Sequence, residues 1–82
     1  MKPVIKTFLA DASVLILEGF RNILSTRPEI DVIGVAANAQ QLSAGIAKQT
    51  PDVLVIDYST GTFSVFEVLD IMKRYPSIRV IG

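Results

Sequence analysis

Apolar residues recur along this chain with two different spacings, one typical of strands and one of helices. Short β-prone apolar runs stand at 4–10, 32–37, 52–57 and 78–82. Between these runs the apolar residues follow the three-to-four-residue spacing of amphipathic helices. The pattern therefore predicts about four strands and three helices in strict alternation.

Polar and breaking residues mark the ends of the expected helices. Ser13 is placed to cap a helix over 14–26, and Asn38 begins a second helix that Pro51 closes. A third helix is expected to run up to Tyr75 and Pro76. The apolar residues that mark these helices are Leu17, Phe20, Ile23 and Leu24 in the first, Leu42, Ile46 and Ala47 in the second, and Phe66, Leu69, Ile71 and Met72 in the third.

Alternating strands and helices predict βαβ units, and hence an open α/β fold with a parallel sheet and right-handed crossovers. The run 52–57 contains four consecutive apolar residues, which favours a central strand buried on both faces over a half-exposed one. No repeat, low-complexity stretch or flexible linker divides the 82 residues. We therefore expect a single small domain over 1–82.

Candidate chemistry lies where strands end, because ligands of open parallel sheets bind at the carboxyl ends of the strands. Asp11 follows the first predicted strand, and Asp57, Ser59 and Thr60 follow or end the third. If these strands are neighbours, two carboxylates face one crevice, and a hard cation such as Mg²⁺ offsets their repulsion. For Asp11 a role as helix cap or turn former is an equal alternative. Asp52, at the opposite end of the third strand, is interpreted as a solvated turn residue.

Composition excludes several classes of site. Eight basic and eight acidic residues give a formal charge of zero, so we expect no direct nucleic-acid binding by this segment. The absence of Cys and His excludes thiolate and histidine chemistry, and no dinucleotide or P-loop glycine motif is present. No apolar run approaches the ~18 residues that span a bilayer, and no signal pattern opens the chain. We expect no membrane association and a cytoplasmic location.

Several stretches together resemble the receiver domains of two-component response regulators, which have a flavodoxin-like fold. They are Phe8-Leu9-Ala10-Asp11, Leu17-Glu18-Gly19-Phe20, 28–34, Pro51-Asp52-Val53-Leu54-Val55-Ile56-Asp57 and Phe66-Glu67-Val68-Leu69. The spacing from Asp11 to Asp57 agrees as well, and the resemblance covers essentially the whole chain. It is strongest for the branch in which a receiver precedes a LuxR-type helix-turn-helix domain.

The resemblance implies a phosphorelay. A histidine kinase would transfer a phosphoryl group to Asp57, and Mg²⁺ would be held by Asp11, Asp57 and the main-chain carbonyl of Ser59. The negative charge gained on phosphorylation would control an output domain. The resemblance implies that this is a C-terminal DNA-binding domain in the parent protein. The segment itself would not be an enzyme.

Three departures from the family pattern qualify this interpretation. Ala12 stands where a second acidic residue is usual, which should weaken metal binding. The loop after the acceptor reads Thr60-Gly61-Thr62, with Val65 where a glycine is usual. The usual Ser/Thr and Lys that follow the later strands have no counterpart, so we expect a partial receiver lacking its final strand and helices. We further expect self-association through an exposed Ile78–Ile81 edge.

Two other functions compete with the phosphoacceptor. A pseudo-receiver would use the same fold as a phosphorylation-independent protein–protein interaction module, as Ala12 and the altered loop would favour. A small enzyme or cofactor-binding domain on a flavodoxin-like scaffold is the third alternative, because fold does not fix function.

Overall fold

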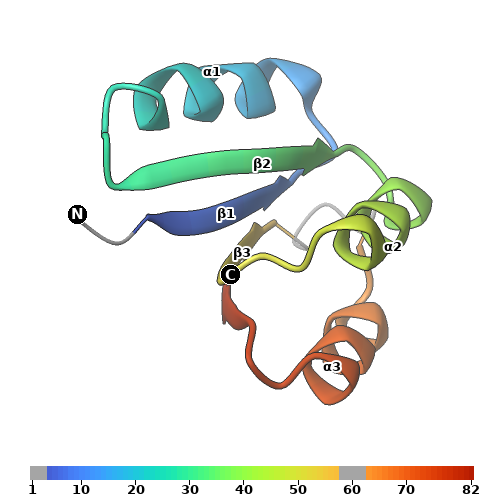
Figure 1. Ribbon diagram of the computed structural model, residues 1–82. Helices are drawn as coiled ribbons and strands as arrows, with labels where there is room; N and C mark the ends of the chain where they lie inside the picture. The colour runs from blue at the N-terminus through green and yellow to red at the C-terminus, as the bar shows by residue number, and fades with distance from the viewer. Residues whose placement is uncertain (1–3, 58–62) are drawn as a thin grey trace.

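In the part of the chain that the structure describes, four parallel strands form one sheet in the order β2-β1-β3-β4, and three helices cover it (Figure 1). The computed structural model describes residues 4–57 and 63–82. The elements are β1 (Ile5–Ala10), α1 (Val14–Leu24), β2 (Ile30–Ala36), α2 (Ala39–Lys48), β3 (Val53–Ile56), α3 (Val65–Arg74) and β4 (Arg79–Ile81). The predicted open parallel α/β fold is confirmed, with element ends shifted by a few residues.

The strand register separates the two faces of the sheet. Leu9 of β1 pairs with Val55 of β3, which pairs in turn with Ile81 of β4. Because neighbouring paired residues point to the same side of a sheet, these three side chains share one face. Phe8 and Leu54, one residue earlier in each strand, point to the other. Figure 1 shows α1 on one side of the sheet and α2 and α3 on the other.

The main core lies between the sheet and the pair α2 and α3. Phe8 is its central side chain, 3% exposed, and a Cβ built on Gly34 of β2 or on Gly45 of α2 would lie 2.6 Å from its ring. Both glycines are therefore needed for the ring to fit between strand and helix. The buried cluster consists of Phe8, Ala10, Ala36, Leu42, Ile46, Leu54, Ile56, Phe63, Val68, Ile71 and Ile78.

Each helix begins at a side-chain cap, because the first turn of a helix has unpaired N–H groups that a short polar side chain can bind. Ser13 Oγ accepts a hydrogen bond from the Ile16 N–H, and Asn38 Oδ1 accepts one from Gln41. Ser64 caps α3 in the same way. The two predicted helix starts at Ser13 and Asn38 are confirmed.

The helix faces differ from those that the apolar spacing indicates. On α1 only Leu17 is buried, whereas Phe20 and Ile23 are exposed. On α3 the buried residues are Val68 and Ile71. The remaining marker residues that prove exposed are Ala47, Phe66, Leu69 and Met72. These helices carry apolar residues on more than one side, so spacing alone does not identify the side that meets the sheet.

β3 is central in the sheet, as predicted, but it is not fully buried on both faces. Leu54 and Ile56 are buried against α2 and α3, while Val53 and Val55 on the α1 side are only partly buried. The physical reason is that, among the described elements, only α1 covers this side.

Ile78 immediately precedes the edge strand β4 and is buried in the core. The edge 78–81, which was expected to be exposed, therefore presents less apolar surface than predicted. Among the described residues, no helix is long and apolar enough to cross a membrane.

Candidate functional site

Asp11 is fixed at the carboxyl end of β1 by its neighbours on both sides. Its main-chain N–H donates a 3.0 Å hydrogen bond to the carbonyl of Ala36, which ends β2. Its Oδ1 accepts a 2.9 Å hydrogen bond from the Ser13 N–H, forming the turn that leads into α1. The side chain is 7% exposed. Asp11 is thus a turn former, the role that the sequence left open beside cation binding.

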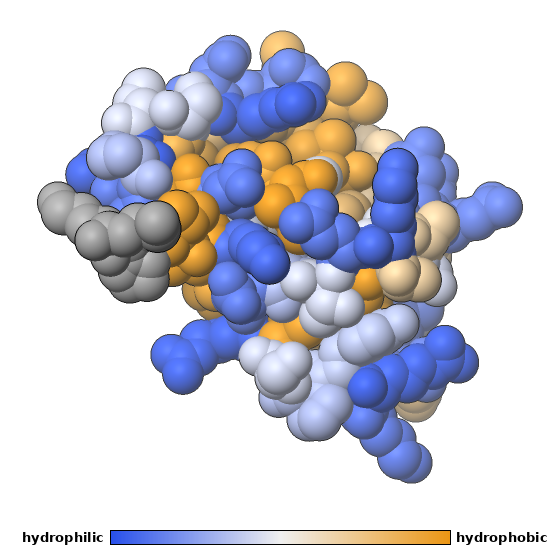
Figure 2. All heavy atoms as spheres, viewed as in Figure 1, coloured by the Kyte–Doolittle hydropathy of each residue, from blue (hydrophilic) through white to orange (hydrophobic). Residues whose placement is uncertain are grey.

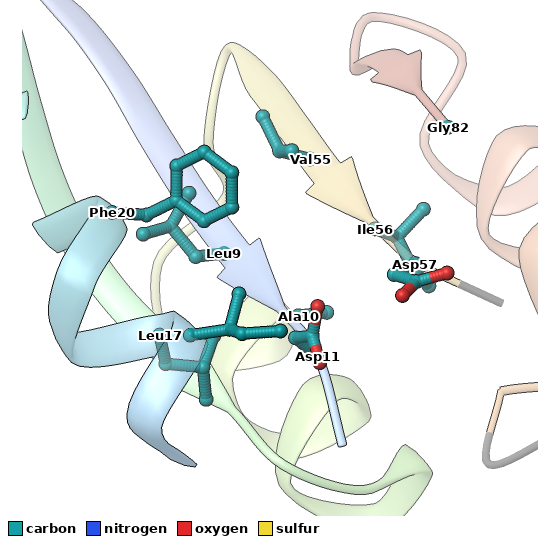
Figure 3. A pocket seen from close by; sticks show the side chains of 10 residues that line it. Leu9, Ala10, Asp11, Leu17, Phe20, Val55, Ile56, Asp57 and Gly82 are labelled. Carbon is teal, nitrogen blue, oxygen red and sulfur yellow. The ribbon is translucent and has the colours of Figure 1, made fainter. Parts of the chain in front are cut away.

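Asp57 occupies the same rim at the end of the neighbouring strand. Ala10 and Ile56 are the last paired residues of β1 and β3, and the Asp57 N–H donates a 3.0 Å hydrogen bond to the Ala10 carbonyl. Asp11 and Asp57 each follow one of these paired residues, so their backbones lie side by side. Figure 3 shows both carboxylates beyond the tips of the two strands. The strand adjacency on which the predicted carboxylate pair depends is confirmed.

A cleft of about 340 Å³ lies between α1 and the sheet and contains both carboxylates. Its walls are mostly apolar, and Figure 3 shows Phe20 and Leu17 of α1 on one side with Val55 of β3 on the other. The lining residues are Leu9, Ala10, Asp11, Ile16, Leu17, Phe20, Val55, Ile56, Asp57 and Gly82. An apolar wall next to charged groups reduces solvent screening of those groups.

The two carboxylates form a donor set suited to Mg²⁺. This ion takes oxygen ligands, commonly one or two carboxylates, and completes its shell with waters and phosphate oxygens. Across residues 4–57 and 63–82, no group of three or more acidic, His or Cys side chains could hold a metal. A cation bound by Asp11 and Asp57 would therefore need further ligands that are not such side chains, for example main-chain carbonyls, waters or phosphate oxygens.

The third predicted ligand cannot be placed. The main-chain carbonyl of Ser59, and the predicted loop with Thr60, lie within 58–62, outside the described residues. Val65 is the first residue of α3 and is exposed. Ala12 lies in the turn between Asp11 and Ser13, partly buried, and supplies no ligand oxygen from its side chain.

Sequence reasoning allowed Asp11 to be a turn former but did not identify the two contacts that hold it. The Ser13 N–H and the Ala36 carbonyl hold Asp11 from the α1 side and the β2 side. The spacing Asp11-Ala12-Ser13 carries a signal for the first contact, because an Asp side chain commonly binds the N–H two residues later. The contact with Ala36 has no local signal, since it depends on the pairing of β1 with β2.

Comparisons with known proteins agree with this fold. No protein-family model matches the chain. The transcriptional regulatory protein YxjL of Bacillus subtilis, itself uncharacterised, is 34% identical over 82 residues, which cover 98% of this chain and 37% of the relative. The DNA-binding transcriptional activator DevR/DosR of Mycobacterium tuberculosis is 29% identical over 79 residues, or 95% of this chain and 36% of the relative. The chain thus spans little more than a third of each regulator.

Solved structures point the same way. The isolated REC domain of RcsB from Salmonella enterica, solved with a phosphomimetic beryllium fluoride, superposes with a TM-score of 0.82 at 20% identity. The match covers 94% of this chain and 59% of that one. This chain belongs to the receiver domains of response regulators. Other relatives are protein-glutamate methylesterases, of which the receiver covers less than a quarter.

Proposed function

We propose that this receiver domain accepts a phosphoryl group from a histidine kinase on the carboxylate of Asp57. The observation that carries the proposal is the placement of Asp57 beside Asp11, on neighbouring parallel strands and in one cleft. A phosphoryl group brings negative charge, so its transfer to a carboxylate requires a site that can gather and balance charge. The two carboxylates at the shared rim of β1 and β3 support this by offering oxygen ligands to a cation, which would balance the charge.

In the proposed step an oxygen of Asp57 attacks the phosphorus of a phosphohistidine. The P–N bond breaks while a P–O bond forms, giving an acyl phosphate on the chain. The leaving imidazole keeps the electron pair of the broken bond and departs neutral because its other nitrogen carries a proton. The phosphoryl group ends on the receiver, so the segment acts as an acceptor and is assigned no turnover of its own.

A bound Mg²⁺ would neutralise charge on the transferring group and orient it toward the attacking oxygen. We assign its ligands to Asp11, Asp57 and the main-chain carbonyl of Ser59. The Ser13 N–H fixes Oδ1 of Asp11 and so holds the carboxylate in one orientation. Ala12 contributes no carboxylate, so this receiver should bind the ion more weakly than one with two adjacent acidic residues.

The output that we propose is transcriptional. The regulators to which the chain is similar are named as transcriptional proteins, and the chain spans only part of their length. A DNA-binding domain in the longer protein would supply the contact with DNA, since this segment has a formal charge of zero. The added negative charge at Asp57 would shift the receiver between two conformations and change its partner contacts.

Phosphotransfer can be tested with a small phosphodonor such as acetyl phosphate in the presence of Mg²⁺. We expect a mass gain of one phosphoryl group that Asp57→Asn abolishes and Asp11→Asn strongly reduces. Asp52→Asn is the matched control, because Asp52 stands at the opposite end of β3, where its Oδ2 accepts a hydrogen bond from the Lys6 N–H. A gain that survives in Asp57→Asn would place the acceptor elsewhere.

A phosphorylation-independent interaction module is the second candidate, favoured by Ala12. It predicts no mass gain and no binding of Mg²⁺ while partner binding persists. Titration of the unmodified chain with Mg²⁺ by calorimetry separates the two functions. Binding that is lost in Asp11→Asn supports the phosphoacceptor, and no binding at millimolar Mg²⁺ supports the interaction module.

A further inference from the structure

The side chain of Gln41 lies at one end of a series of hydrogen bonds that reaches the candidate site. Its Oε1 accepts a 2.9 Å hydrogen bond from the Ala37 N–H, just before α2. The Ala37 N–H and the Ala36 carbonyl belong to the same peptide group, which is planar and close to rigid. That carbonyl accepts the 3.0 Å hydrogen bond from the Asp11 N–H. One rigid peptide group is thus held at one end by Gln41 and at the other by Asp11.

A second peptide group continues the series to Asp57. The Asp11 N–H and the Ala10 carbonyl belong to one peptide group, and that carbonyl accepts the 3.0 Å hydrogen bond from the Asp57 N–H. Two rigid groups in series therefore connect the side chain of Gln41 with the main chain of Asp57. Hydrogen bonds in such a series polarise one another, so each is stronger while the others are made.

The two ends of the series differ in their exposure to solvent. Ala10 and Ala36 are buried, and Asp11 is 7% exposed. Gln41 is exposed, and Figure 2 shows hydrophilic residues at the surface on the side of the molecule where Figure 1 places α2. Water can replace the Gln41 oxygen at this outer end, but a water molecule is not anchored to α2. The Gln41 side chain is what holds this peptide group in one orientation.

We propose that Gln41 is a positioning residue of the candidate site. By binding the Ala37 N–H it fixes the direction of the Ala36 carbonyl, and so the position of Asp11 on the rim beside Asp57. Gln41 is not among the residues that line the cleft, so it acts only through these main-chain groups. The inference rests on the proposed function, because it takes the two carboxylates as ligands of Mg²⁺.

The hydrogen-bond series is tested first without ion or phosphodonor, by NMR of the 82-residue chain. Gln41→Met keeps the length of the side chain and removes the acceptor oxygen. We expect the amide proton resonances of Ala37, Asp11 and Asp57 to move upfield, because the hydrogen bonds weaken together. Gln41→Glu keeps an acceptor oxygen and should prevent this movement.

Asn38→Ala is the matched control, because it removes the other half of the reciprocal pair at the start of α2 and leaves the bond between Gln41 and Ala37 in place. It should not move the resonances of Asp11 and Asp57. Unmoved resonances in Gln41→Met, or equal movement in Gln41→Met and Asn38→Ala, would overturn the proposal.

Calorimetric titration with Mg²⁺ tests the consequence for the site. We expect the dissociation constant to rise at least about twofold in Gln41→Met, since one net hydrogen bond corresponds to roughly a two- to tenfold change in an equilibrium constant. Gln41→Glu should restore the affinity, and Asn38→Ala should bind as the natural chain does. Equal affinities in the natural chain and Gln41→Met would overturn the positioning role and leave the proposed function intact.

A natural chain that binds no Mg²⁺ would instead contradict the proposed function. The amide resonances of Asp11 and Asp57 would then decide by themselves whether Gln41 fixes the rim, because they are recorded without the ion.

Discussion

Ala12 stands next to Asp11 at the rim of β1, and under the proposed function it is the position at which the site lacks a carboxylate. Ala12→Asp would place a third carboxylate next to the two proposed ligands, Asp11 and Asp57. Affinity for a hard divalent cation rises with the number of charged ligands. We expect Mg²⁺ to bind about tenfold more tightly, about 1.4 kcal/mol, as measured by calorimetric titration. Ala12→Asn is the control of equal size, and equal affinities in the two variants would show that position 12 does not face the ion.

The packing around Phe8 gives a second prediction at the scale of single residues. A Cβ at Gly34 or Gly45 would overlap its buried ring, whereas a Cβ at Gly19 on the exposed side of α1 meets nothing within 4 Å. We expect Gly34→Ala to lower the free energy of unfolding by about 1–3 kcal/mol through overpacking. Gly19→Ala should raise it by about 0.5–1 kcal/mol through helix propensity. Urea denaturation, at protein concentrations that keep the chain monomeric, compares the two variants. The prediction requires that their changes in the free energy of unfolding have opposite signs.

At the scale of elements, the start of α2 is held by the side chains of Asn38 and Gln41. Each accepts a hydrogen bond from a main-chain N–H at or beside the other residue. Asn38 Oδ1 accepts from the Gln41 N–H, and Gln41 Oε1 accepts from the Ala37 N–H, each at 2.9 Å. This reciprocal arrangement is close to a capping box. α2 lies directly after β2, whose last residue Ala36 accepts the Asp11 hydrogen bond. The cap therefore stabilises a segment that adjoins the candidate site.

Asn38→Ala removes this cap, and we expect a loss of about 1 kcal/mol in the free energy of unfolding. Asn38→Asp keeps an acceptor at the same position and should lose little. Thermal unfolding followed by circular dichroism measures the difference. Equal losses in the two variants would mean that the cap hydrogen bond is not what stabilises α2.

At the scale of the whole molecule, a cation at the rim should stabilise the entire fold. A domain of this size has a small stability margin, and an ion that binds only the folded state adds to it by mass action. At a Mg²⁺ concentration of a hundred times the dissociation constant, the gain is about 2.7 kcal/mol. The midpoint of thermal unfolding should rise with Mg²⁺ in the natural chain and in Asp52→Asn.

The same titration should leave Asp11→Asn unchanged, because that variant removes a proposed ligand. It also replaces a carboxylate oxygen by an amide oxygen that can still accept the hydrogen bond from Ser13, so the turn into α1 is kept. A rise of equal size in Asp11→Asn would show that the stabilising ion binds elsewhere on the surface.

The order of the elements and the starts of α1 and α2 were determined by the sequence itself. Strand-like runs, helical spacing and the caps at Ser13 and Asn38 act over a few residues, so they can be identified without knowing the fold. The position of Asp57 at the end of the most apolar strand is a local feature of this kind. Its proximity to Asp11 followed only on the condition that the two strands are neighbours.

That condition, and the helix faces, were decided by the tertiary structure alone. β1 lies between β2 and β3, a non-local pairing that no local pattern encodes. Phe66 and Phe20 satisfy helical spacing as well as Val68 and Leu17 do, but only the latter two are buried. The choice depends on which neighbouring elements are present to cover each side, because burial is a property of contacts between distant segments. For the same reason, the incomplete burial of Val53 and Val55 on the α1 side of the sheet could be identified only from the folded chain.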